Sequence, residues 1–382
     1  MRTLGGDDSA EPGRTVGVEE EFLLADAHTG APAARAGAVL GATGRDLAGG
    51  TVLQPELFSS QVETASGVCT ALSELDAQLV SARERLAAAA RPADLRVLAA
   101  GTPPLPGSAR PAVSAGDRFE RVARTYRAAV ADYQACGLHV HVGLADRELA
   151  VAVLNHLRPW LPALLALSVN SPLHLGSDTG YGSWRMVQQS RFPGSGVPPQ
   201  LRSAADHDEQ IAKLVDCGVL VDPAQSFWLA RPSPHLPTIE FRVADTAITA
   251  REAVAQAALC RALVRTALAE LRAGREAPPV RDQFARAAVW CAARDGLAGY
   301  GVHVSRECRV PAPDLVSELI ERAAPALAET GDLQRVRSVV SELVRHGTGA
   351  QRQRAAAAAG VPELLDLLAA GADSRTERGA HA

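Results

Sequence analysis

The fold of this chain is decided by residues 137–144, Gly-Leu-His-Val-His-Val-Gly-Leu. One valine separates the two histidines, and successive side chains of a β-strand point to opposite faces. His139 and His141 are therefore predicted to share one face of a strand, while the leucine and the valines occupy the other face. The pattern indicates a strand with an apolar back and a chemically active front.

Three other stretches alternate in the same way and place polar side chains on one face. These side chains are Glu19 and Glu21 in the first stretch, Gln61 and Glu63 in the second, and Thr238, Glu240 and Arg242 in the third. Glu20 is predicted to point to the opposite face, so the substitution Glu20→Gln is expected to be mild. Four strands of this kind indicate a sheet with one polar, concave face.

The residue types on this face fit a site for hard divalent cations. Carboxylates with imidazole suit Mg²⁺ or Mn²⁺ better than Zn²⁺, which prefers cysteine and histidine. Buried like charges at this density are tolerable only with a cation or a phosphate between them. Arg242 follows Glu240 by two residues, and its guanidinium could hold a phosphate group. Nucleotide-dependent phosphoryl transfer is therefore predicted, although spacing leaves a two-metal hydrolase open.

Each of these patterns also has an ordinary structural explanation. A run such as Glu19-Glu20-Glu21 is often a solvated edge, and a histidine on a strand is often a satisfied structural residue. A glutamate two residues before an arginine often forms a cross-strand ion pair. The agreement of four stretches on one face favours the functional interpretation. No GxxxxGK[ST] motif occurs in the sequence, which excludes a P-loop enzyme.

Composition narrows the class of partner and the compartment. The net charge of −4 argues against a nucleic acid or an anionic membrane surface as the main partner. The six cysteines form no CxxC pair and are predicted to be reduced, mostly buried thiols of a cytosolic protein. The longest apolar runs, such as Leu161 to Leu167, are too short to span a bilayer. We expect a cytoplasmic protein with small-molecule substrates, assembled as a homo-oligomer, in the simplest case a dimer.

The order of predicted elements indicates a single α+β domain over residues 15–370. Residues 1–14 are predicted to be a disordered tail and residues 371–382 a flexible one. Helices are predicted at 71–90, 117–134, 146–158, 160–169, 206–217, 250–273, 281–295, 312–329, 331–346 and 361–370. The stretch 170–200 is predicted to be a long loop, and loops of this length inside compact domains tend to be functional.

Five motifs follow one another along the chain. They are Thr15-Val16-Gly17-Val18-Glu19-Glu20-Glu21-Phe22-Leu23-Leu24, Glu56-Leu57-Phe58-Ser59-Ser60-Gln61-Val62-Glu63, Cys136-Gly137-Leu138-His139-Val140-His141-Val142-Gly143, Trp160-Leu161-Pro162 through Asn170-Ser171-Pro172 to Asp178-Thr179-Gly180-Tyr181, and Arg231-Pro232-Ser233-Pro234 with Thr238-Ile239-Glu240-Phe241-Arg242. In this order, over about residues 15 to 370, the chain resembles the glutamate–cysteine ligase type 2 family, the YbdK-type carboxylate–amine ligases.

The resemblance implies a glutamine-synthetase-like fold, in which a curved antiparallel sheet with packed helices lines a metal and ATP site. It also implies ATP-dependent amide formation through an acyl phosphate, with ATP and Mg²⁺ or Mn²⁺ as cofactors. The implied metal ligands are Glu19, Glu21, Glu56, Glu63, His139 and Glu240. Arg242 and Glu240 are the implied catalytic residues, and ATP contacts are assigned to Arg242, Gln61, Thr238 and His141. Substrate contacts are assigned to Arg185, Arg191 and Tyr181.

Two departures from the family pattern concern the substrates. Pro103 stands where family members commonly have histidine, and Ala287-Ala288 stands where they have Glu-Asn before a tryptophan. Glutamate and cysteine are therefore the default pair of substrates by resemblance only. A specialised amide ligase with another acid or amine is one alternative, and a nucleotide-binding homologue without turnover is another.

Overall fold

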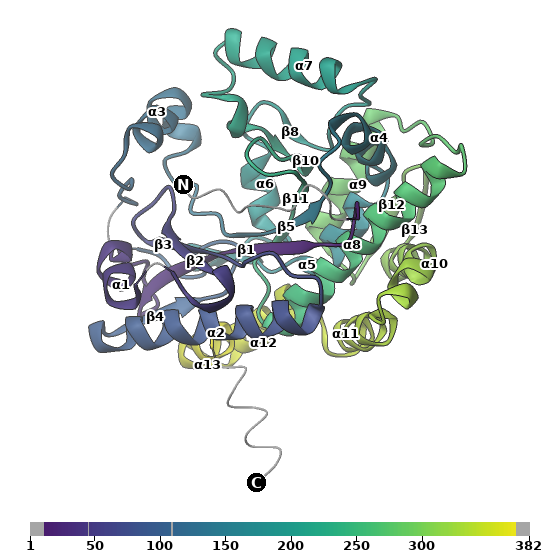
Figure 1. Cartoon of the computed structure of the whole chain (residues 1–382). Helices are drawn as coiled ribbons and strands as arrows, with labels where there is room; N and C mark the ends of the chain where they lie inside the picture. Colours follow the sequence, from purple (N-terminus) through teal and green to yellow (C-terminus); the bar gives the residue numbers. More distant parts are fainter. Residues whose placement is uncertain (1–10, 45, 108–109, 372–382) are drawn as a thin grey trace.

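A seven-stranded antiparallel sheet forms the centre of the molecule (Figure 1). The structure, a computed structural model, describes residues 11–44, 46–107 and 110–371. The strands of the sheet follow the order β10-β11-β5-β1-β3-β2, and β4 pairs with β1. Their bounds are β1 (Val16–Asp26), β2 (Val52–Pro55), β3 (Gln61–Ala65), β4 (Leu95–Leu98), β5 (Gly137–Gly143), β10 (Ala230–Pro232) and β11 (Thr238–Asp245). The four predicted polar strands are thus confirmed as β1, β3, β5 and β11.

Helices surround this sheet and occupy most of the C-terminal half. Their bounds are α1 (Ala36–Thr43), α2 (Leu72–Ala90), α3 (Asp117–Tyr126), α4 (Arg147–Leu157), α5 (Leu161–Ser168), α6 (Trp184–Gln189), α7 (Ala204–Asp216), α8 (Ala250–Arg272), α9 (Asp282–Asp295), α10 (Ala312–Glu329), α11 (Leu333–His346), α12 (Gly349–Ala359) and α13 (Val361–Leu368). Short strands form small separate sheets: β6 (Leu173–His174) with β7 (Ser177–Asp178), β8 (Ser195–Gly196) with β9 (Phe227–Trp228), and β12 (Tyr300–His303) with β13 (Cys308–Pro311).

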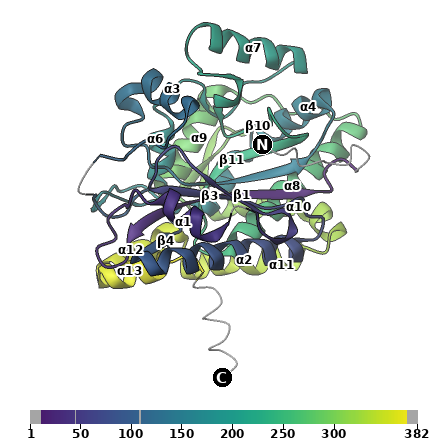
Figure 2. The same ribbon diagram turned by 60° about the vertical axis from the view of Figure 1, so that its left-hand side comes forward.

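The apolar back of the sheet packs on helices. Val18, Val140 and Phe241 each expose 1% of their surface and belong to one large core cluster with residues of α2 and α8. In both views α2, α12 and α13 lie below the sheet, while α3 and α7 lie above it (Figures 1 and 2). The hydrophobic effect therefore fixes which face of each strand is covered, and the polar face is left on the other side.

The register of the sheet brings the polar side chains into rows. Glu19 lies opposite His139, Glu21 opposite Glu63, and His141 opposite Glu240. The pairing of β11 with β5 is irregular between Phe241 and Ala244, which is the disruption that a β-bulge produces. Because Arg242 lies within this irregularity, its position could not be derived from strand alternation alone.

Two predicted segments differ from the observed elements. The helix predicted at 117–134 ends at Tyr126, because Arg127 adopts a positive φ of 49° that an α-helix cannot accommodate. The loop predicted at 170–200 contains the helix α6, which begins where the Ser183 side chain accepts a hydrogen bond from the backbone of Met186. Six residues are too few to produce a recognisable helical period. The alanine-rich α12, which lacks an apolar stripe, was not predicted.

Three smaller expectations can be compared with the described residues. Residues 11–14 of the predicted N-terminal tail lie against the sheet, where Gly13 donates to Gly143 O at 2.8 Å; residues 1–10 and 372–382 of the predicted tails lie outside the described residues. All six cysteines are free, but only Cys69, Cys136 and Cys260 are buried. Among the described residues no single helix is long and apolar enough to cross a membrane. The helices α4 and α5 are long and apolar enough only when taken together, and the chain bends by 68° between them.

Candidate active site

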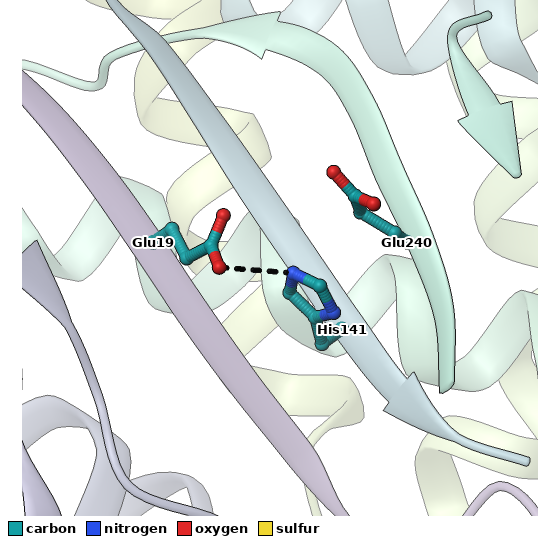
Figure 3. A group of neighbouring side chains, drawn as sticks. All are labelled: Glu19, His141 and Glu240. Atoms are coloured by element: carbon teal, nitrogen blue, oxygen red, sulfur yellow. Dashed lines mark ion pairs between the residues drawn. The ribbon is translucent and has the colours of Figure 1, made fainter. Parts of the chain in front are cut away.

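Three side chains from neighbouring strands converge at the centre of the polar face. Glu19 of β1, His141 of β5 and Glu240 of β11 point toward one another (Figure 3). One ligand atom from each lies within 4.8 Å of the others, and His141 Nε2 is 3.3 Å from Glu19 Oε1. His141 Nδ1 lies 2.9 Å from Thr238 Oγ1, which orients the ring. In the register Glu240 lies directly opposite His141, whereas Glu19 lies opposite His139 and approaches His141 diagonally across β1 and β5.

His139 lies two residues before His141 on β5 and contacts two acids of β1. Its Nδ1 is 3.1 Å from Glu19, and its Nε2 is 3.6 Å from Glu21. Burial, together with the nearby positive charge of Arg242, lowers the pKa of His139 to about 4. Burial opposes ionisation of Glu19, but His141 and the hydrogen bonds from both imidazoles bring its pKa below the ordinary value. His139 is therefore neutral at physiological pH, the form in which imidazole can bind a metal.

The acids at the next position crowd one another. Glu21 lies opposite Glu63, and its Oε2 accepts a 2.6 Å hydrogen bond from the backbone N–H of Gly137. Burial and the charge of Glu56 raise the pKa of Glu21 to about 8. Burial also raises the pKa of Glu63 well above the ordinary value, with Glu19, Glu56 and Glu21 adding to the effect, and burial raises the pKa of Glu56. These carboxylates lack enough positive partners to ionise together.

Glu240 differs from these acids because two arginines hold it. Arg231 donates to both of its carboxylate oxygens, at 2.8 and 3.2 Å, and Arg242 forms an ion pair with the same carboxylate. Burial opposes ionisation of Glu240, but Arg231 and Arg242 lower its pKa well below the ordinary value. Arg231 was not assigned a role from the sequence. Arg231 lies opposite Glu240 in the pairing of β10 with β11, a register that the sequence does not specify.

Arg185 reaches the acidic end of the site from α6. Its side chain is 3% exposed; Nη2 donates to Arg242 O at 3.1 Å, and Nη1 lies 3.7 Å from Asp245. The guanidinium passes over Gly137, where a Cβ atom would lie 2.4 Å from Nη2. Nε and Nη1 are buried without a hydrogen-bond partner among the described residues. A buried guanidinium with unpaired donors is costly, and an anionic ligand would satisfy it.

The remaining predicted residues occupy distinct positions. Gln61 donates to Ala135 O at 2.8 Å and to Cys136 Sγ at 3.3 Å, which leaves its Oε1 buried without a partner among the described residues. Tyr181 packs edge-on against Trp184 and Trp290. Arg191 forms an ion pair with Asp132 at 2.6 Å rather than with the acids of the polar face.

The donor set of the polar face fits a divalent cation. The face carries Glu19, Glu21, Glu56, Glu63, Glu240 and two imidazoles, which is the mixture that Mg²⁺ and Mn²⁺ accept. The ion pair of His141 with Glu19 brings a ligand nitrogen and a ligand oxygen together, and the raised pKa values of Glu21 and Glu63 reflect uncompensated negative charge. In the described part of the chain, the group whose ligand atoms lie within 4.8 Å of one another contains His141, which lies between Glu19 and Glu240, whereas His139 contacts Glu19 and Glu21.

Glu20 lies on the opposite face, as the alternation predicted. Its carboxylate is fully buried and pairs with Arg83 of α2 through hydrogen bonds of 2.5 and 3.1 Å. Arg83 also donates to the backbone oxygens of Ile248 and Ala247, at 2.8 and 3.0 Å. The expectation that Glu20→Gln is mild concerns the site; for stability we expect a larger effect, since the substitution removes the buried carboxylate that pairs with Arg83.

Comparison with known proteins identifies the family. A family model described as "Glutamate-cysteine ligase family 2" matches residues 15–374 of this chain. The chain belongs to this family. A protein of Saccharopolyspora erythraea named "Putative glutamate--cysteine ligase 2-2" is 55% identical over 370 residues, which cover 96% of this chain and 94% of that protein. A protein of Nocardia farcinica named "Putative glutamate--cysteine ligase 2-1" is 45% identical over 339 residues, which cover 89% and 88%. By membership of glutamate-cysteine ligase family 2 the protein is an ATP-dependent carbon–nitrogen ligase in class, as predicted.

Solved structures support the fold of this family member. A glutamate–cysteine ligase of Francisella tularensis in complex with AMP has a TM-score of 0.67 at 14% identity, over 94% of this chain and 88% of that one. A bifunctional glutathione synthetase of Pasteurella multocida has a TM-score of 0.64 at 14% identity, over 96% of this chain and 52% of that one. At such identity the likeness concerns the fold alone, and it confirms the predicted α+β, glutamine-synthetase-like class.

Proposed function

We propose that the protein uses ATP to join a carboxylate to an amine through an acyl phosphate. The observation that supports this most is the acidic, histidine-bearing face of the sheet, with guanidinium groups at both ends, in a member of glutamate-cysteine ligase family 2. Phosphoryl transfer requires groups that neutralise and position phosphate oxygens, and this face supplies both kinds.

The carboxylates and imidazoles are proposed to hold the cations. Glu19, His141 and Glu240 form the central group, and the acids and imidazole beside it complete the set: Glu21, Glu56, Glu63 and His139. Mg²⁺ or Mn²⁺ bound here would neutralise negative charge on the ATP phosphates. Arg231 keeps Glu240 ionised and oriented, because it donates to both carboxylate oxygens. Thr238 fixes the ring of His141 in the same way.

Arg242 is proposed to hold the phosphoryl group during transfer. Its side chain is partly buried, its pKa is raised by Glu240 and Glu21 against the effect of burial, and its Nε has no hydrogen-bond partner in the described residues. In the first step an oxygen of the substrate carboxylate bonds to the γ-phosphorus of ATP, and the bond from that phosphorus to the ADP oxygen breaks. In the second step the amine nitrogen bonds to the carbonyl carbon, the bond to phosphate breaks, and one proton is released. A planar guanidinium can follow two phosphate oxygens through both steps.

Arg185 is proposed to position the carboxylate substrate. Its buried, unpaired donors lie at the end of the site that carries Glu21, and α6 and Asp245 hold them in place. Positioning of this kind raises the rate because the reacting atoms are brought together before the chemical step. Tyr181, from the segment that precedes α6, and Gln61 are proposed to contact substrate and nucleotide respectively.

The default substrates are glutamate and cysteine or a related amine. At the positions that depart from the family pattern, the side chains of Pro103 and Ala288 carry no polar group. Both residues are buried, and the backbone oxygen of Pro103 accepts a hydrogen bond from Leu175 N at 3.0 Å. This favours a specialised ligase for another acid or amine as the second candidate. A homologue that binds nucleotide without turnover is distinguished from both by its lack of ADP release.

A substrate screen tests the proposal. The purified protein is incubated with ATP, Mg²⁺ and pairs of amino acids, and ADP release is measured with each compound alone and with both. We expect release that requires an acid and an amine together. With an oxygen-18-labelled carboxylate, one label atom should appear in the released phosphate. An active enzyme that transfers no label would refute the acyl phosphate, and ADP release without any amine would indicate a hydrolase.

A further inference from the structure

Two tyrosines pack into one aromatic cluster, which also contains Phe192 and Phe227. The rings of Tyr126 and Tyr133 both meet Phe192 edge to face, with centroid distances of 5.1 and 4.8 Å. Phe192 and Phe227 stack on one another at 4.5 Å. Aromatic contacts of this kind prefer specific geometries, so they fix the orientation of each ring as well as burying it.

The hydroxyl groups of these two tyrosines have different surroundings. The Tyr126 hydroxyl donates to Val219 O at 2.9 Å, and the charged groups that act on it are Asp222 and Arg118. The Tyr133 hydroxyl forms no hydrogen bond within the part of the chain that the structure describes. The charged groups that act on Tyr133 all belong to the site: Arg185, Glu21, Arg242 and Glu56.

Contacts on both sides place Tyr133 at the end of the site that Arg185 reaches. Gln189, one turn after Arg185 on α6, donates to Phe227 O at 3.0 Å, and the Phe227 ring lies 6.5 Å from that of Tyr133. Four residues after Tyr133, the chain passes beneath the Arg185 guanidinium at Gly137, where a Cβ atom would lie 2.4 Å from Nη2. Tyr133 therefore lies between α6 and the start of β5.

The Tyr133 hydroxyl can act as a neutral hydrogen-bond donor in this position. Burial raises the pKa of Tyr133 to about 12, so the hydroxyl keeps its proton at physiological pH. A fixed donor of this kind stabilises negative charge that develops on an oxygen atom during a reaction.

The proposed reaction has one oxygen that needs such a donor. A carboxylate held by Arg185 uses one oxygen to bond to the γ-phosphorus of ATP. The other oxygen becomes the carbonyl oxygen of the acyl phosphate. It carries negative charge again when the amine nitrogen bonds to the carbonyl carbon, until the bond to phosphate breaks.

We propose that Tyr133 is a further catalytic residue, whose hydroxyl donates a hydrogen bond to the carboxylate oxygen that does not bond to phosphorus. The inference rests on the proposed ligase function. Arg185 holds the carboxylate from α6, and Tyr133 holds it from the segment before β5. Because the hydrogen bond strengthens as charge returns to that oxygen, Tyr133 contributes more to the rate than to substrate binding.

Removal of one hydroxyl group tests this proposal. Tyr133→Phe keeps the ring and its aromatic contacts, and Tyr126→Phe makes the same change elsewhere in the same cluster. The probe is L-glutamate with L-cysteine, replaced by the fastest pair of the substrate screen if that pair differs, and ADP release is followed at saturating Mg²⁺. We expect Tyr133→Phe to lower kcat about 100-fold, as is usual when one donor to a developing oxyanion is removed, with an unchanged KM for ATP.

Stability should change in the opposite sense. Tyr126→Phe should unfold at a lower urea concentration than the wild type, because Val219 O loses its side-chain donor, yet it should keep the wild-type kcat. Tyr133→Phe should unfold at the wild-type urea concentration. This pattern separates a hydroxyl that contacts substrate from one that only supports the fold.

Three results would overturn the proposal. The first is a wild-type kcat in Tyr133→Phe while the wild type releases ADP, which leaves the ligase function intact. The second is an equal loss of kcat in Tyr126→Phe, which would show that the cluster as a whole affects the rate. The third is the absence of ADP release by the wild type with every pair, which would refute the ligase function together with this role of Tyr133.

Discussion

Glu20 and its partner Arg83 allow a sharp test of the face assignment on β1. Glu20 lies between two proposed metal ligands, yet its side chain is buried on the apolar back of the sheet, where Arg83 is 1% exposed. Breaking a buried ion pair by removing one partner costs about 3–5 kcal/mol. We expect Glu20→Gln to lower the free energy of unfolding by this amount and to retain ATP turnover at temperatures where the variant remains folded.

Urea denaturation followed by circular dichroism measures the effect. The matched control is Glu209→Gln on α7, where the carboxylate pairs with Lys213 at 2.5 Å but both side chains are more than half exposed. This exposed pair should contribute less than about 1 kcal/mol. The double variant Glu20→Gln, Arg83→Gln should be less destabilised than the sum of the two single variants, because it leaves neither charge unpaired.

Two results would refute this reasoning. If Glu20→Gln unfolds at the same urea concentration as the wild type, with an unchanged denaturant slope, the ion pair does not stabilise the fold as inferred. If a fully folded Glu20→Gln is inactive while Glu21→Gln retains turnover, the assignment of faces on β1 is displaced by one residue.

Three further predictions concern the polar face. Glu19→Ala, Glu21→Ala and Glu240→Ala should each abolish ATP turnover with a native circular dichroism spectrum; a variant with near-wild-type turnover at saturating Mg²⁺ would not carry a required ligand. Arg242→Lys should lower kcat far more than it weakens ATP binding measured by calorimetry, and excess Mg²⁺ should not restore the rate, whereas restoration would show that Arg242 only orients Glu240. Because burial raises the pKa of Glu21 to about 8, a bound cation must displace its proton, so the affinity for Mn²⁺ should increase as the pH rises toward that value, with proton release in calorimetry; a pH-independent affinity would contradict this assignment.

The strands of the site were predictable because their signal is local. Alternation over five to eight residues separates His139 from Val140 and Glu21 from Phe22, and burial of the apolar set then fixes the face that remains. Neighbouring strands bring such faces together whatever the connecting segments do. The placement of Glu19 beside both histidines needed the strand order β11-β5-β1 and the register of β1 on β5 in addition.

The contributions from outside these strands were harder to predict. Arg185 lies on a helix of six residues, and its burial depends on contacts with Gly137 and Asp245, which are distant in sequence. Arg231 acts through a cross-strand pair whose register the sequence did not specify. The buried pairing of Glu20 with Arg83 required α2 to pack on the back of β1, which alternation alone does not establish.

The distribution of charge along the polar face explains why cations are expected at one part of it. Arg231 and Arg242 both pair with Glu240, so the β11 side of the face is nearly balanced without a ligand. Among the described residues Glu21 and Glu63, on β1 and β3, form no comparable ion pair with an arginine, and burial with the neighbouring carboxylates raises the pKa of both, which favours their protonated forms in the metal-free protein. A divalent cation there would replace protons rather than disrupt existing ion pairs, which costs less free energy. We therefore expect the first cation to bind toward Glu21 and Glu63, and the phosphate-holding role to remain with the arginine that faces them.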